Sequence, residues 1–351
     1  MIRTFVWLLR SFSVSKFANN LMDFRLEKYI NRSLIELLKN TTLGTNGAKY
    51  KHLDIEKRIH LVDNPLHFTL TKNQKILGNI TFCNREKGIY LRYFAFDNRF
   101  QGTGKKRSKA SKSLLKNKIE LLFEQLELDE NKSFYAYIDP KNTRSKWLSE
   151  QFRFQSQGKL ITQTFSRFYP KASKQLQVID NFNEIAELVR KQYGNHHYYF
   201  EKQSSLPEFL ALKNENEELL AFAKFTKVNW EICRLPGKFG GILTKLIPFI
   251  PLLNKLIRPK LHSFIVPEIV SLLDEKPEHL QELFSSALAY YSVNSLVWWV
   301  DMNDSIYQKN FKKINWGLLD KLVGRSEVEI VVRGKLTKSN VPFFVSAFDM
   351  I

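Results

Sequence analysis

Hydrophobic positions change their spacing along the first half of the chain. Residues 24–48 place leucine and isoleucine three and four positions apart, which predicts a helix. Two apolar runs then flank the polar segment Lys72–Lys75, which predicts a β-hairpin. A third strand is predicted at Ile89–Phe96, and residues 114–123 return to helical spacing.

Strands and helices alternate over the rest of this half. The pattern predicts a strand at Phe134–Ile138, a helix near Ser145–Gln151 and a hairpin made of residues 152–157 and 160–167. A helix between two strands usually joins parallel neighbours. We therefore predict an α+β fold with a mixed, mostly antiparallel sheet, one parallel crossover and flanking helices.

The order of elements repeats after Tyr169–Lys174, a polar segment typical of a linker. The predicted strands are residues 176–179, 209–212, 219–228, 263–272 and 295–300, and the predicted helices are 182–193, 278–292 and 305–314. A final strand pair is predicted at 328–332 and 343–348.

This repetition predicts two tandem units. Residues 1–48 form an N-terminal extension and helix, residues 49–170 the first unit, and residues 175–351 the second. An apolar insertion, residues 235–259, interrupts the second unit. Pro248 and Pro251 prevent a continuous helix there. Either a packed lid or a surface for acyl chains or peripheral membrane contact fits this composition.

Charge distinguishes the two halves. The chain carries 54 Lys and Arg against 35 Asp and Glu, a formal charge of +19. Residues 1–170 hold 31 basic and 15 acidic residues, a net of +16, which leaves +3 for the remainder. A polyanionic ligand, nucleic acid or an anionic membrane would be attracted to the first half.

Cysteine and apolar content limit the class of protein. Two cysteines cannot form a disulfide framework or a cysteine-rich zinc site, and we predict no metal cofactor. No apolar run reaches the roughly 18 residues of a membrane span. The default prediction is a cytoplasmic protein. The basic, acid-free N-terminal residues would be a short surface-anchoring helix, or an upstream extension if Met22 is the true start.

A glycine turn lies between the third predicted strand and the helix that follows it. A strand, a glycine-rich turn and a helix start bring unpaired backbone N–H groups to one point, which suits a pyrophosphate. From Arg99 to Lys118 there are eight basic residues and no acidic one. The segment therefore predicts an anion site.

Two motifs give the first half its resemblance to a known family. The turn Arg99-Phe100-Gln101-Gly102-Thr103-Gly104 matches the pattern [RQ]-x-x-G-x-[GA], and Asp139-Pro140-x-Asn142 follows at a suitable distance. With these motifs, residues 60–168 resemble the GNAT superfamily of acyl-CoA-dependent N-acyltransferases. The resemblance implies acetyl-CoA, or another acyl-CoA, as co-substrate.

The resemblance also implies roles for individual residues. The backbone of Phe94–Phe96 would pair with the pantetheine amides, and one of its N–H groups would stabilise the oxyanion. The implied cofactor-binding residues are Phe94, Ala95, Phe96, Gln101, Gly102, Thr103, Gly104, Lys105, Lys106 and Asn142. The candidate catalytic residues are Tyr93 and Tyr137, with Tyr90 and Tyr135 as alternative proton donors, and Glu86 or Asp97 as base.

Three departures from the family pattern limit the assignment. If the motif is aligned from Gln101, Lys106 occupies a position that favours glycine or alanine. Ser149 stands where many relatives have the tyrosine that protonates the leaving thiolate. In the second half, no glycine turn follows residues 264–270 and the local charge is acidic, so we predict a degenerate unit that does not bind coenzyme A.

The predicted reaction is transfer of an acyl group, most simply acetyl, from acyl-CoA to a primary amine on a small molecule or peptide. No specific nucleic-acid partner is predicted. Two alternatives remain open. One is a Fem-type peptidyl transferase that uses aminoacyl-tRNA, which the basic first half would suit. The other is a non-catalytic protein that binds acyl-CoA.

Overall fold

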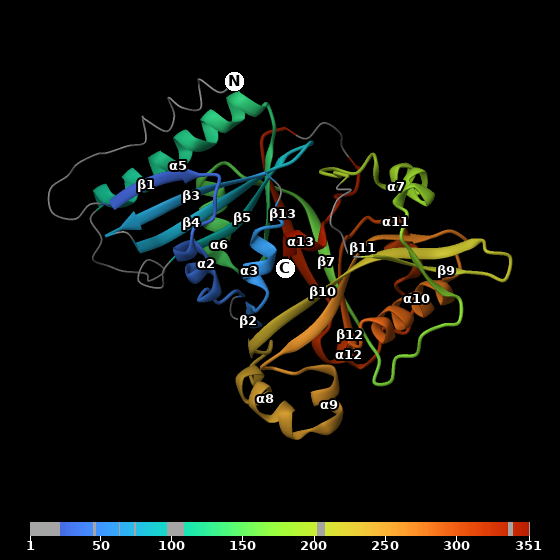
Figure 1. The fold of residues 1–351 in the computed structure, drawn as a ribbon. Helices are drawn as coiled ribbons and strands as arrows, with labels where there is room; N and C mark the ends of the chain where they lie inside the picture. Colours follow the sequence, from blue (N-terminus) through green and yellow to red (C-terminus); the bar gives the residue numbers. More distant parts are fainter. Residues whose placement is uncertain are drawn as a thin grey trace.

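One continuous β-sheet runs through both halves of the chain (Figure 1). The computed structural model describes residues 22–44, 47–62, 64–73, 75–96, 109–201, 208–335 and 340–350. Within them the sheet has 13 strands. Among the described residues, no helix combines the length and hydropathy needed to cross a membrane.

The first half supplies seven strands and four helices of the described chain. The strands are β1 (Met22–Glu27), β2 (Lys49–His52), β3 (Pro65–Lys72), β4 (Lys75–Asn84), β5 (Ile89–Phe96), β6 (Phe134–Ile138) and β7 (Gln155–Ser166). The helices are α2 (Arg32–Lys39), α3 (Ile55–Ile59), α5 (Lys109–Glu130) and α6 (Thr143–Gln151).

The second half repeats the order from β3 to β7, with additional helices. Its strands are β8 (Leu176–Ile179), β9 (Phe209–Lys213), β10 (Leu219–Arg234), β11 (His262–Leu272), β12 (Ser295–Asp301) and β13 (Ser326–Arg333). Its helices are α7 (Ala186–Tyr193), α8 (Gly240–Leu246), α9 (Pro251–Leu256), α10 (Pro277–Tyr290), α11 (Ser305–Asn310), α12 (Leu318–Val323) and α13 (Ala347–Met350). Two short 3₁₀ turns are η1 (Phe182–Glu184) and η2 (Ile247–Phe249). The additional helices lie between β10 and β11 and before β13.

The two units exchange their last strands. The sheet order is β1-β3-β4-β5-β6-β13-β7-β12-β11-β10-β9-β8, so β13 lies between β6 and β7, and β7 pairs with β12. β13 is antiparallel to both neighbours, with Glu329 opposite Ile138 on β6 and opposite Lys159 on β7. The strand order is pseudo-symmetric: the second half provides β13 to the first, and the first half provides β7 to the second.

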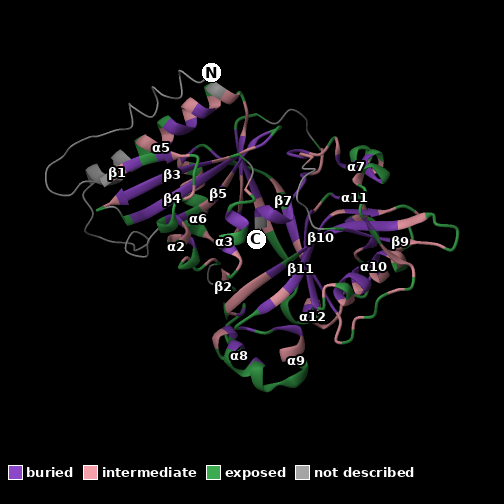
Figure 2. Ribbon diagram, viewed as in Figure 1, coloured by how far each residue is buried: buried purple, intermediate pink, exposed green. Residues whose placement is uncertain are grey.

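The hydrophobic cores follow the same exchange. On one face of the sheet, Leu122 and Phe123 of α5 share a core with Val331 of β13. In the second unit, Phe284 of α10 shares a core with Phe165 of β7. The C-terminal part of each exchanged strand is buried, whereas its first residues are more exposed; Figure 2 shows the buried residues of the sheet in purple. Neither unit would have a complete core without the strand from the other.

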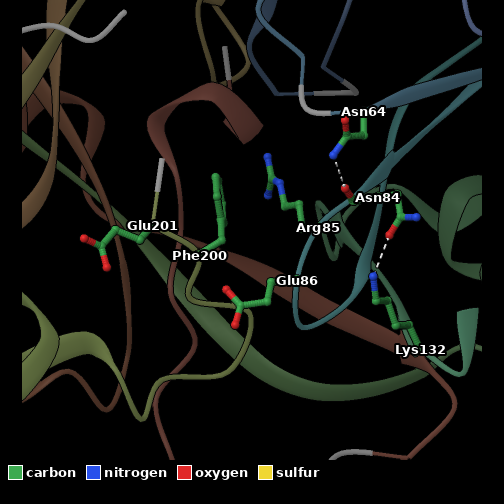
Figure 3. Close-up of a pocket in the computed structure, with 7 residues that line it drawn as sticks. All are labelled: Asn64, Asn84, Arg85, Glu86, Lys132, Phe200 and Glu201. Atoms are coloured by element: carbon green, nitrogen blue, oxygen red, sulfur yellow. Dashed lines mark hydrogen bonds between the residues drawn. The ribbon is translucent and has the colours of Figure 1, made fainter. Parts of the chain in front are cut away.

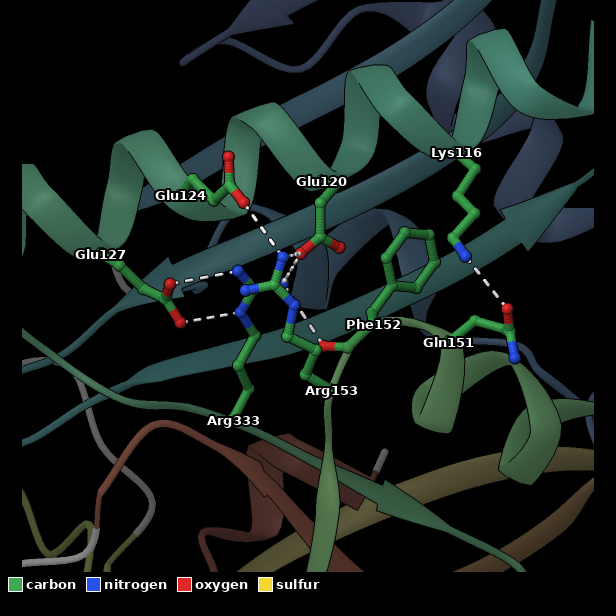
Figure 4. Close-up of polar contacts among 8 residues, drawn as sticks. All are labelled: Lys116, Glu120, Glu124, Glu127, Gln151, Phe152, Arg153 and Arg333. Carbon is green, nitrogen blue, oxygen red and sulfur yellow. Dashed lines mark hydrogen bonds and ion pairs between the residues drawn. The ribbon is translucent and has the colours of Figure 1, made fainter.

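An arginine on β13 connects the exchanged strand to α5 (Figure 4). Arg333 donates through Nε and Nη2 to the two oxygens of Glu127 at 2.7 and 3.1 Å, and through Nη1 to Glu120 at 3.0 Å. Only 3% of the Arg333 side chain is exposed, whereas Arg153, which also pairs with Glu120, is 67% exposed.

The structure confirms the predicted fold class, a mixed and mostly antiparallel sheet with flanking helices. The parallel pairs are β5 with β6 and β11 with β12. The predicted strands at Ile89–Phe96, Phe134–Ile138 and Leu176–Ile179 have the same bounds in the structure. The division at residues 170–175 stays a prediction, and the sheet continues across it.

Three local predictions were wrong. The helix predicted at 24–48 is β1 followed by the shorter α2, because Phe24 and Leu26 are buried at the alternating spacing of a strand. The hairpin predicted at 152–167 is the single strand β7, in which Gly158 lies against the ring of Phe343. Residues 343–348 do not pair with β13, whose two edges are occupied by β6 and β7.

Replacing Arg333 by methionine should destabilise the protein by roughly 3 kcal/mol, because it removes the partner of the partly buried Glu127 and one of the two arginines that bind Glu120. The matched change Arg153→Met removes an exposed partner of the same Glu120 and should cost less than about 1 kcal/mol. Urea unfolding of both variants measures the difference. Equal losses would contradict the structural role given to the exchanged strand.

Candidate functional site

A β-bulge distorts β5 near its end. Asn79 of β4 pairs with Ala95, but Thr81 pairs with Arg92, so two residues of β5 face one residue of β4. One of the two, Tyr93, has a φ of 52°, a left-handed conformation that is uncommon for residues other than glycine. The Asn79 amide donates to the Tyr93 carbonyl at 3.1 Å and holds the distortion in place.

The parallel strands β5 and β6 separate just before this bulge. Their ladder in the described residues consists of Ile89 with Phe134 and Tyr90 with Tyr135. Both strands continue beyond this point, β5 to Phe96 and β6 to Ile138. The edge of β5 that faces β6 therefore lies, at the bulge, where an extended ligand could add to the sheet.

Three tyrosines cover the sheet face opposite α5 at this separation. The rings of Tyr90, Tyr135 and Tyr137 lie 5.2 to 6.0 Å apart. Burial raises the pKa of all three phenols well above the ordinary value of 10. They therefore remain protonated at neutral pH and can donate hydrogen bonds.

The C-terminal residues 340–350 pack onto these tyrosines. Tyr90 donates to the carbonyl of Asp349 at 2.7 Å, and Tyr137 donates to its Oδ2 at 3.3 Å. Arg85 binds the same carboxylate through both terminal nitrogens and also donates to the Tyr135 hydroxyl at 2.7 Å. Figure 1 shows α13 at the centre of the molecule, between the two halves.

The second unit anchors the same segment through buried acids. Glu268 of β11 pairs with Lys224 at 2.7 Å and accepts from the Ser346 hydroxyl at 3.0 Å and from the Ala347 N–H. Asp301 accepts from the Phe343 N–H at 2.9 Å. Residues 340–350 therefore connect the second unit to the separation of β5 and β6.

The bulge is duplicated in the second unit. On β11, Ile269 has a φ of 52°, and the pairing with β10 shifts from Phe222–Ser271 to Lys224–Glu268. The parallel ladder of β11 with β12 is again short, at Ile265 with Leu296. The two units thus share the local geometry, but the turn after β11 carries Asp274 and Glu275 in place of glycines.

An aromatic wall joins β2 to β10 beside the bulge. The rings of Tyr50 and Trp230 stack at 4.0 Å, and His52 stacks on Trp230 at 5.5 Å. Burial, with the nearby charges of Arg92 and Arg58, lowers the pKa of His52 to about 3. The imidazole is therefore neutral in the folded protein.

The structure places the predicted site residues in three groups. Tyr93 and Tyr137 lie at the separation of β5 and β6, together with Phe94, Ala95 and Phe96. Glu86 precedes β5 and lines a different cavity of about 370 Å³ (Figure 3). The predicted residues Gln101, Gly102, Thr103, Gly104, Lys105 and Lys106, and the alternative base Asp97, lie outside the described residues.

The residues of the second predicted motif have structural roles. The side chain of Asn142 caps α6 by accepting from the Ser145 N–H at 3.0 Å. Ser149, at the position of the expected proton donor, donates to the carbonyl of Lys146 at 2.8 Å within its own helix. The role of Asn142 toward a ligand, like that of Glu86 as base, stays a prediction.

Sequence reasoning missed Arg85 and Asp349. They are 264 positions apart, and no motif surrounds either of them. The buried pairing of Arg85 with Asp349 becomes visible only once the fold has brought these distant segments together. Among the described residues, no group of His, Cys, Asp and Glu is arranged to hold a metal ion.

Comparisons with known proteins find similarity only in structure. No protein-family model and no curated protein matches the sequence. Saccharomyces cerevisiae N-myristoyltransferase with bound myristoyl-CoA aligns with a TM-score of 0.55 and 11% identity, over 93% of this chain and 82% of that chain. A candidate acetyltransferase from Pyrococcus horikoshii aligns with a TM-score of 0.50 and 10% identity, over 96% and 98%. This chain therefore shares its overall fold with both of these structures.

The duplicated bulges show that the two halves of the chain are built alike. Each unit contributes a bulged strand, a parallel neighbour and a covering helix, and the exchanged strands close both units into one sheet. The predicted tandem arrangement agrees with this order.

His52 should make stability depend on pH. An unfolded chain binds a proton on this imidazole below about pH 6.5, whereas the folded pKa is about 3, so the free energy of unfolding falls as the pH drops between these values. His52→Phe should reduce that slope by about 1.4 kcal/mol per pH unit. Urea unfolding at several pH values measures the slope, and identical slopes in both proteins would contradict the neutral buried His52.

Proposed function

We propose that this chain is an acyltransferase that transfers an acyl group from acyl-CoA to a primary amine, with the acyl-CoA bound by the first unit. The observation that carries the proposal is the bulge at Tyr93–Phe94 beside the separation of β5 and β6. It occurs in a fold shared with an N-myristoyltransferase that binds myristoyl-CoA. The amine acceptor could be a small molecule or a peptide.

The residues of the first unit fit the parts of an acyl-CoA. The edge of β5 at Phe94–Phe96 would pair with the pantetheine amides as an added strand. Backbone N–H groups of Gln101–Lys106, which connect β5 to α5, would bind the pyrophosphate. The acid-free run from Arg99 to Lys118 supplies positive charge for the phosphates.

The chemistry follows from this placement. The neutral amine attacks the thioester carbonyl, a C–N bond forms, and an N–H of the bulged strand stabilises the oxyanion. The C–S bond then breaks, the nitrogen loses a proton, and the thiolate gains one. Tyr137 or Tyr93, which burial keeps protonated, would donate to the thiolate as it leaves, and the proton lost by the nitrogen would restore the phenol.

Asp349 has a positioning role in this proposal. Its carboxylate is bound by Arg85 and accepts from Tyr137, so it fixes the phenol and α13 together. The second unit would supply part of the acceptor site, since Asp349 and Trp230 of β10 pack with the tyrosines of β5 and β6.

Glycine substitutions in the turn should abolish ligand binding. The double variant Gly102→Val/Gly104→Val would crowd the pyrophosphate, and we expect a loss of affinity for acetyl-CoA and myristoyl-CoA of at least about 100-fold by calorimetry, equivalent to about 2.7 kcal/mol. Gly47→Val is the matched control, because a Cβ at Gly47 meets no atom within 4 Å.

Three outcomes would contradict the proposal in different ways. Unchanged acyl-CoA binding by the double variant would show that the glycine turn is not part of the binding site. Binding of acyl-CoA without transfer to any amine would leave a binding protein rather than an enzyme. Steeply salt-dependent binding of tRNA, with no binding of coenzyme A, would favour the Fem-type alternative.

A further inference from the structure

The insertion between β10 and β11 is a folded projection with its own small core. It contains α8, η2 and α9 and extends away from the sheet (Figure 1). Leu235, Ile247, Leu256 and Ile257 pack together and against Leu319 of α12. The Thr244 hydroxyl accepts from the Leu235 N–H at 2.9 Å and donates to the Gly240 carbonyl at 2.6 Å. The projection is therefore attached to the second unit by a defined inner face.

Its outer face is apolar and exposed. Phe239, which precedes α8, and Ile242, Leu243 and Leu246 within it recur at helical spacing and are 73%, 60%, 40% and 50% exposed. An amphipathic helix of a globular protein normally turns this stripe toward the core, and α8 turns it outward. Figure 2 shows the projection exposed along its outer edge.

The stripe continues into η2 and α9. Phe249 is 82% exposed and Leu252 is 56% exposed, with Ile250 between them. Residues 239–252 hold seven of the 21 exposed large apolar side chains in the described chain. Single exposed apolar residues are normal, but a cluster of this kind marks an interaction surface.

Within the insertion itself the charged residues have one sign. Residues 232–267 contain six basic residues and no acidic one. Lys238, Lys245, Arg258 and Lys260 are exposed. A second copy of the chain would bring a surface of the same sign against this one, which disfavours self-association. Anionic lipid headgroups complement both the basic residues and the apolar side chains between them.

We propose that this outer face docks onto the surface of an anionic lipid bilayer. Phe239, Ile242, Leu246, Phe249 and Leu252 would enter the boundary between headgroups and acyl chains, and the surrounding lysines and arginines would contact the phosphates. The projection lies on the membrane and does not cross it. This proposal does not depend on the acyltransferase proposal, because none of the residues of this outer face belongs to the candidate site at β5 and β6.

Vesicle flotation of the full chain tests the proposal. We expect binding to phosphatidylcholine vesicles containing roughly one third phosphatidylglycerol, and much weaker binding to pure phosphatidylcholine. Phe249→Glu/Leu252→Glu should lower the partition coefficient at least about tenfold. The matched control Leu121→Glu/Leu128→Glu changes two side chains of α5 that are 54% and 80% exposed, and it should bind like the unmodified chain.

A second variant separates the charge from the apolar contribution. Lys238→Glu/Lys245→Glu should weaken binding to the anionic vesicles and reduce its dependence on salt. Circular dichroism of each variant confirms that it is folded. Failure of the unmodified chain to bind either vesicle, or equal binding by Phe249→Glu/Leu252→Glu, would overturn the proposal. A dimer that this variant dissociates in sedimentation would also overturn it, in favour of an interface between copies.

Discussion

β13 hydrogen-bonds along both of its edges to strands of the first half, with β6 on one side and β7 on the other. The rest of the fold depends on this exchange. It continues the sheet from the first unit into the second and adds Val331 to the core under α5. It also leaves β7 free to pair with β12 and to fill the second core with Phe165. Because each core lacks a strand without the other unit, the two halves are expected to fold as one cooperative body.

The same exchange determines what surrounds the candidate site. With β13 beside β6, residues 340–350 return across the sheet face opposite α5 and reach Tyr90 and Tyr137. Glu268 and Asp301 of the second unit bind this segment, and Arg85 of the first unit binds Asp349. Duplicated bulges give the two units one architecture. The glycine turn and its basic flank distinguish the first unit as the one suited to a phosphate-bearing ligand.

Local signals predicted local elements well. Long apolar runs bounded by turn residues predicted β5, β6 and β8 to the residue, and the repeated order of elements predicted two similar units. Pairing between distant segments could not be predicted, because strand propensity does not say which neighbour a strand will have. The sequence predicts a hairpin in place of β7 because Gly158 resembles a turn residue. In the structure Gly158 instead leaves room for the ring of Phe343. Arg85 and Asp349 have no sequence signal for the same reason. The bulge at Tyr93 is also invisible in the sequence, because a tyrosine gives no sign of a positive φ.

Amide hydrogen exchange with and without myristoyl-CoA tests the central claim most directly, since both units carry the bulge and only one should bind. The account predicts slower exchange at Tyr93–Phe96 on saturation with the ligand. The equivalent residues at the second bulge, Ile269–Leu272, should exchange at unchanged rates. Protection of the second bulge instead of the first, or no protection at β5 under saturating ligand, would contradict an acyl-CoA site in the first unit.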